Sequence, residues 1–89
     1  MKAHDASLAA ELALLLNFME QLQLQIQVNG QAREYIGVHT VAQLLAHLGH
    51  DAVPCAVEVN QQLVPKAKHS QHQLHGGDRV ELVTLVGGG

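Results

Sequence analysis

Apolar and polar residues alternate most clearly in the segment "QLQLQIQV", residues 21–28. Leucine, isoleucine and valine occupy its even positions and glutamine its odd ones, which is the two-residue period of a strand with one buried face. Asn29-Gly30 follows directly, a dipeptide that tolerates the positive φ angles of a tight hairpin turn. The pattern therefore predicts a hairpin whose second strand runs to about Ile36, where Gly37 breaks it.

The next segment, "HTVAQLLAHLGH", has the period of a helix instead. Thr40 is typical of an N-cap residue, and Gln43 three positions later completes a capping box. Apolar residues then recur at i, i+3, i+4 and i+7, and Gly49 supplies a stop signal at the C-terminal end. We expect one buried stripe on this helix, formed by Val41, Leu44, Leu45 and Leu48.

Short strands make up the rest of the chain. "CAVEVN" places Cys55, Val57 and Val59 on one face, and "LVP" predicts a short strand whose proline suits a sheet edge. "LHGGD" predicts a turn before the last strand, "RVELVTLV" at residues 79–86. Together these elements predict an α+β fold, with a mixed sheet of four or five strands and one main helix packed on one face.

The first twenty residues differ from the rest, because they contain no glycine or proline and many strong helix formers. Ser7 could cap a helix from Leu8 to about Met19. Glu11 interrupts its apolar run and no small-residue cleavage site follows, which argues against a signal peptide. The segment is also too short and too acidic to span a membrane. Its apolar residues fall at helical spacing at Leu8, Leu12, Leu15 and Met19, and Leu14, Leu16 and Phe18 widen the surface.

We interpret residues 1–20 as an N-terminal extension, helical or disordered, that the domain does not need, with Met19 as the natural start. The alternative is a helix that docks on a partner or on a second copy of the chain. An isolated helix of about a dozen residues is marginal in water, so we expect it to be ordered only where it docks.

Composition limits the classes of function. Eighty-nine residues make one small domain. The net charge of −3, with no arginine stripe and no aromatic stacking platform, argues against nucleic acid as a partner. The single cysteine, Cys55, excludes an internal disulfide and favours a reducing, cytoplasmic setting.

Metal-binding and catalytic patterns are weak. His69, His72 and His75 recur every third residue, but no cysteine or carboxylate cluster joins them, so we expect a solvated run and no metal site. Cys55 lies within an apolar alternation, which favours a buried small hydrophobe over a nucleophile. No phosphate-binding loop or dinucleotide fingerprint is present. We expect no catalytic residue in this chain.

The last strand continues directly into Gly87, Gly88 and Gly89, where the sequence ends. Glycine costs more backbone entropy to order than any other residue, and no turn or cap here needs it. A short tail without side chains, starting from a rigid strand, suits insertion into another protein.

These segments, taken in order, resemble the ThiS family of sulfur carriers. The resemblance rests on "VNGQ", "TVAQLLAHLG", "VEVNQQLVP", "GGDRVELVTLV" and the terminal "GGG", and runs from about residue 22 to 89. It implies the ubiquitin-like β-grasp fold, with a domain at residues 21–86 and a flexible tail at 87–89. The sequence departs at one position, where His69 stands in place of a tryptophan that many ThiS proteins carry after "VP".

The resemblance also implies a function. ThiS-like proteins are not enzymes and bind no cofactor. A ThiF-like adenylating enzyme activates the C-terminal carboxylate with ATP, sulfur replaces the activated oxygen, and a ThiG-like thiazole synthase takes the sulfur from the thiocarboxylate for thiamine biosynthesis. On this basis Gly88 and Gly89 carry the sulfur and Gly87 extends the reach. Val83 and Leu85, which should point away from the helix, are the predicted partner surface.

Two alternatives stay open. The molybdopterin-synthase small subunit and tRNA-thiolation carriers share the fold and the Gly-Gly end, although the "VNG…VP…GDRVE" pattern favours ThiS. The chain could instead be a non-catalytic β-grasp interaction module whose glycines are incidental.

Overall fold

A computed structural model describes residues 2–85, with side chains from Ser7 onward. A five-stranded mixed sheet with the order β2-β1-β5-β3-β4 forms its centre. The α+β architecture predicted from the sequence is confirmed. The elements in chain order are α1 (Lys2–Gln21), β1 (Gln23–Val28), β2 (Gln31–Ile36), α2 (Val41–His47), β3 (Cys55–Val59), β4 (Gln62–Val64), a 3-10 turn (Lys66–Lys68) and β5 (Arg79–Thr84).

The predicted hairpin is present. β1 and β2 pair antiparallel from Gln23↔Ile36 to Val28↔Gln31. Asn29 and Gly30 between them have φ angles of 50° and 81°, which the tight turn requires and this dipeptide tolerates. The odd positions of β1 are exposed and the even ones are buried, as the alternation predicted.

α2 begins at the predicted capping box. The Gln43 backbone N–H donates to the Thr40 hydroxyl at 3.2 Å, and the Thr40 N–H donates to the Gln43 side-chain oxygen at 3.1 Å. Two further amides of the first turn are satisfied by the loop before β5: Val41 donates to the His72 carbonyl and Ala42 to that of His69. The start of the helix is therefore joined to that loop as well as capped.

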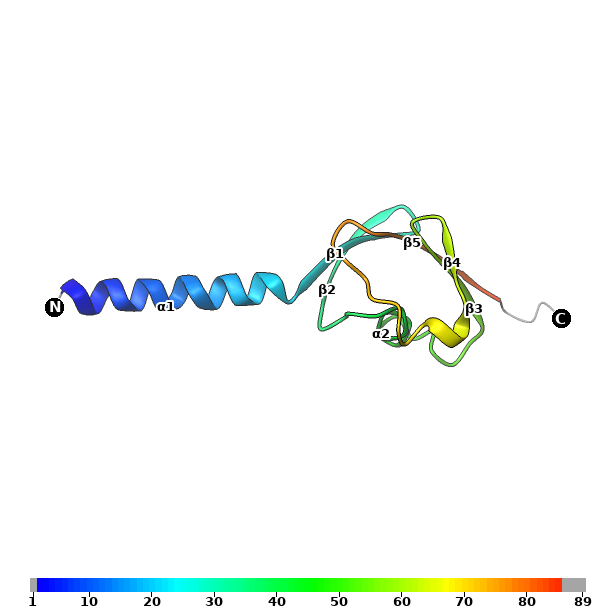
Figure 1. The fold of residues 1–89 in the computed structure, drawn as a ribbon, viewed down its shortest axis with the longest axis horizontal. Helices are drawn as coiled ribbons and strands as arrows, with labels where there is room; N and C mark the ends of the chain where they lie inside the picture. The colour runs from blue at the N-terminus through cyan, green and yellow to red at the C-terminus, as the bar shows by residue number, and fades with distance from the viewer. Residues whose placement is uncertain (1, 86–89) are drawn as a thin grey trace.

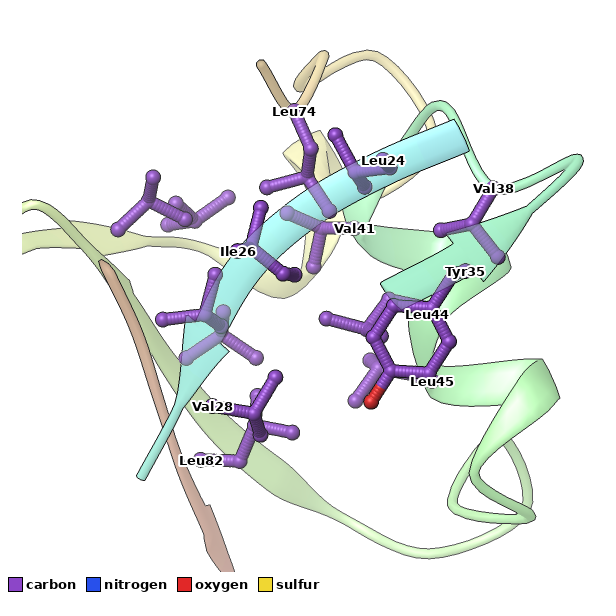
Figure 2. Close-up of a cluster of buried hydrophobic side chains, with 14 residues drawn as sticks. Leu24, Ile26, Val28, Tyr35, Val38, Val41, Leu44, Leu45, Leu74 and Leu82 are labelled. Carbon is purple, nitrogen blue, oxygen red and sulfur yellow. The ribbon is translucent and has the colours of Figure 1, made fainter. Parts of the chain in front are cut away.

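The core lies between α2 and one face of the sheet. Figure 2 shows Leu24 and Ile26 of β1 on one side and Val41, Leu44 and Leu45 of α2 on the other. Each such buried side chain contributes roughly 1.5–3 kcal/mol. The opposite face of the sheet carries exposed glutamines and charged residues, so it is the open face. The full core comprises Leu24, Ile26, Val28, Tyr35, Val38, Val41, Leu44, Leu45, Val57, Val59, Val64, Leu74, Val80 and Leu82.

His69 corrects one prediction, because it does not belong to a solvated run. Its side chain is only 8% exposed, and its Nε2 lies 3.0 Å from the Val64 carbonyl oxygen. The 3-10 turn after Pro65 brings the ring back beneath the end of β4. The spacing of the histidines did not reveal this turn. His75 is exposed, as predicted, and His72 is intermediate.

α1 projects away from the domain as a continuous helix (Figure 1), and the molecule is 70 Å long. The predicted cap at Ser7 is wrong, since the helix begins at Lys2 and Ser7 lies within it. The residues before Ser7 include neither glycine nor proline, so nothing stops the helix there. At the end of α1 the Leu22 N–H donates to the Met19 carbonyl, and β1 begins at the next residue. In the described part of the chain, no helix has the length and apolarity needed to cross a membrane.

We predict that deleting residues 1–18 leaves the β-grasp domain folded, because none of the described side chains before Leu24 belongs to the core. The melting temperature at low protein concentration should fall by less than about 4 °C, the shift expected for ~1 kcal/mol in a domain of this size. A thermal melt of residues 19–89 beside the full chain provides the measurement. A larger loss would show that α1 covers part of the core.

Candidate functional site

β5 is the strand that leads to the C-terminal tail, and it lies in the middle of the sheet. It pairs antiparallel with β3 and parallel with β1. Because β1 starts where α1 ends and β5 runs in the same direction, β5 must finish at the end of the domain opposite α1. Figure 1 shows α1 and the end of β5 on opposite sides of the domain.

Two polar side chains fix the start of β5. The Asn60 amide donates to Asp78 Oδ1 at 3.0 Å, and its oxygen accepts the Arg79 N–H at 2.9 Å. Asp78 Oδ2 also accepts the His75 N–H at 2.8 Å. The β3–β4 turn and the "GGD" turn are thereby joined at the first residue of β5.

Asn29 holds the middle of β5. The chain turns away from β5 after β1. The last residue pair between the two strands is Val28↔Val80, and the last backbone hydrogen bond runs from the Asn29 N–H to the Val80 carbonyl. The Asn29 side chain continues the pairing in place of a peptide group: its oxygen accepts the Leu82 N–H at 2.8 Å and its amide donates to the Leu82 carbonyl at 3.2 Å. The sequence predicted Asn29 only as a turn residue, because nothing local indicates a contact with a residue 53 positions away.

The far end of β5 is also held in place. The Leu85 N–H donates to the Pro54 carbonyl at 2.8 Å. β5 is therefore anchored at its start, middle and end, and the chain is described up to Leu85. The predicted sulfur-carrying residues, Gly88 and Gly89, and the predicted extension, Gly87, lie outside the described residues.

The predicted partner residues are exposed on the open face. Val83 is 59% and Leu85 53% exposed, whereas Leu82 points into the core, as expected from the alternation. The same face of the sheet also carries Leu63 of β4, which is 68% exposed and lies opposite Glu58 of β3. We call Leu63, Val83 and Leu85 the open-face patch; the sequence missed Leu63 because three residues of strand do not define a face.

The open-face patch has acidic neighbours. Glu58 and Glu81 are exposed and lie opposite each other on β3 and β5, next to Leu63 and Val83. A surface of this kind favours a partner that offers apolar side chains with basic groups around them.

Cys55 is half-buried beside the core and lies opposite Thr84 of β5. Burial raises the pKa of its thiol above the ordinary value, and a hydrogen bond with the Val83 backbone lowers that pKa by a smaller amount. The thiol is therefore mostly protonated near neutral pH, which makes it a poor nucleophile. Among the side chains that the structure describes, residues 7–85, no three histidine, cysteine or acidic groups gather as a metal site would require.

The fold and the anchored last strand define a small ubiquitin-like β-grasp protein. The model of the ThiS family matches residues 26–89. The chain belongs to the ThiS family, as the sequence motifs predicted. α1 lies outside the matched region.

Three relatives support this assignment. The sulfur carrier protein ThiS of Escherichia coli is 35% identical over 66 residues, which cover 74% of this chain and all of the relative. A thiazole synthase of Paramagnetospirillum magneticum is 38% identical over 66 residues, and the chain spans only 20% of that relative's length. The crystal structure of a thiamine biosynthesis protein (ThiS) from Geobacter metallireducens matches with a TM-score of 0.63 and 26% identity, over 74% of this chain and all of that one.

We predict that Asn29→Gly destabilises the domain by about 1–3 kcal/mol, the range for leaving buried partners unsatisfied. Glycine accepts the positive φ of this position, so the loss reports the two bonds to Leu82. Asn29→Asp keeps the acceptor for the Leu82 N–H but sets a carboxylate oxygen against the Leu82 carbonyl oxygen, so it should also lose stability. Urea unfolding of the three proteins provides the measurement, and an unchanged midpoint for Asn29→Gly would show that the side chain does not hold β5.

Proposed function

We propose that the chain is a sulfur carrier whose C-terminal Gly89 is adenylated and converted to a thiocarboxylate, which then supplies sulfur for thiazole formation in thiamine biosynthesis. The observation that carries the proposal is the anchoring of β5 as far as Leu85, directly before a tail made only of valine and glycine. A rigid strand fixes where the tail starts, and the tail gives the carboxylate its reach.

The chemistry explains the tail. The Gly89 carboxylate attacks the α-phosphate of ATP, pyrophosphate leaves, and a sulfur nucleophile then displaces AMP from the acyl adenylate. The same carboxyl carbon must enter the active sites of two different enzymes. Only glycine combines the absence of a side chain with free backbone angles, so Gly87, Gly88 and Gly89 fit channels that a larger residue would block.

On this proposal the chain is the carrier and its partners are the catalysts. A ThiF-like adenylating enzyme would bind and use the ATP, and this chain would hold no cofactor of its own. A ThiG-like thiazole synthase would accept the sulfur. The relative from P. magneticum supports the second partner, since a protein called thiazole synthase contains a stretch similar to this chain.

The alternatives carry less support. Molybdopterin and tRNA-thiolation carriers would use the same tail, but both the curated E. coli relative and the solved relative are called ThiS. A pure interaction module would need no glycine tail after an anchored strand. The need for ATP and the single cysteine favour a cytoplasmic setting.

Deleting Gly89 should abolish thiocarboxylate formation without changing the fold. The deletion withdraws the carboxylate by up to about 3.6 Å, and an error of about 1 Å in the position of a reacting group can cost about a hundredfold in rate. Gly88→Val should have a similar effect, because its side chain would enter a channel shaped for bare backbone. The measurement is intact mass after incubation with the adenylating enzyme, ATP and a sulfur donor.

Gly76→Val is the matched control for the glycine substitutions. A Cβ added at Gly76 meets no atom within 4 Å, and its φ is not positive, so this variant should load like wild type. Wild type should gain the mass difference of one oxygen exchanged for sulfur, localised to the C-terminal peptide. Equal loading of the Gly89 deletion would refute the proposal.

Leu85→Asp should weaken binding to the adenylating enzyme or the thiazole synthase by roughly tenfold or more, because it places a charge in an apolar contact. Ile36→Asp makes the same change at a 66% exposed position of the same open face, opposite Gln23 on the edge strand β2 and at the α1 end of the domain, and should bind like wild type. Titration calorimetry against each enzyme provides the measurement. If folded Leu85→Asp bound both partners as tightly as Ile36→Asp, the open-face patch would not be the docking surface.

A further inference from the structure

α1 exposes more apolar surface than any other element of the described chain. It stands clear of the domain along most of its length (Figure 1). Its large apolar side chains are between 49% and 69% exposed: Leu8, Leu12, Leu14, Leu15, Leu16, Phe18 and Met19. A single exposed leucine needs no explanation, but seven such residues on one helix indicate a surface that another molecule covers.

Four of these residues have the spacing of a helix-pairing seam. Leu8, Leu12, Leu15 and Met19 are separated by four, three and four residues, which is the heptad spacing that keeps one stripe facing a partner helix. Leu16 and Phe18 flank the stripe on its two sides and widen it. The seam itself contains no charged residue, so two copies can meet along it without opposing like charges.

Other occupants fit less well. A helix that lies on a lipid surface is rich in lysine and arginine, but α1 has one lysine and three acidic residues. The open face of its own sheet is out of reach, because only Leu22 separates α1 from β1 and α1 would have to unwind to fold back. A helix with a self-complementary apolar stripe is best matched by the same helix.

We propose that α1 pairs along the Leu8–Leu12–Leu15–Met19 seam with α1 of a second copy of this chain. The pairing leaves the carrier end free, since β5 finishes at the opposite end of the domain. It also accounts for a long helix that its own domain does not stabilise. The inference does not depend on the carrier function, because it concerns only α1.

The test compares two adjacent leucines in the full chain. Leu15→Glu places a charge in the seam, whereas Leu14→Glu makes the same change about 100° around the helix from Leu15 and about 160° from Leu12. Glutamate is a good helix former, so neither change should stop α1 from forming. Sedimentation equilibrium over roughly 1 µM to 1 mM covers the expected range of dissociation constants.

Wild type and Leu14→Glu should associate with the same affinity, and Leu15→Glu should associate roughly tenfold more weakly or not at all. Far-UV circular dichroism should show helix content falling on dilution of wild type, because α1 loses its partner. Thermal melts should show an intact domain in all three proteins. A wild type that stays monomeric at the highest concentration, or equal weakening by both substitutions, would overturn the proposal.

Discussion

The parallel pairing of β1 with β5 is the constraint on which the rest of the molecule depends. It places the last strand in the centre of the sheet, between β1 and β3, where both edges of its backbone are bonded. Backbone pairing alone covers only Gln27↔Arg79 and Val28↔Val80, and the Asn29 side chain extends it to Leu82. The same pairing sends the chain into the domain at one end and out at the other.

This arrangement separates in space the three roles that we propose for the chain. α1 occupies one end and β5 finishes at the other, and Val83 and Leu85 of the open-face patch belong to the last described residues before that end. A partner that docks on Leu63, Val83 and Leu85 therefore meets the strand just before the tail, which shortens the search of the carboxylate for an active site. An association through α1 would leave both the patch and the tail accessible.

The local elements could be predicted from sequence because their causes are local. The alternation of β1, the Asn29-Gly30 turn and the Thr40–Gln43 capping box each depend on neighbouring residues, and all three are present. The exposure of Val83 and Leu85 followed from the two-residue period of the last strand. The second role of Asn29 depends on a contact with a segment 53 residues away, which no local pattern indicates. The burial of His69 depends on the 3-10 turn after Pro65, and a strand as short as β4 does not show which face Leu63 occupies. The start of α1 was misjudged because Ser7 resembles a cap, although the preceding residues also favour a helix.

The most direct test of the account follows the sulfur from the tail into a product. The chain would first be loaded with radioactive sulfur at Gly89 and freed of the adenylating enzyme and sulfur donor. It would then be incubated with thiazole synthase and that enzyme's remaining substrates. The account predicts that label leaves the chain and appears in the thiazole, one sulfur for each carrier consumed. Label that remains on the chain while an active synthase makes thiazole from another carrier would contradict it.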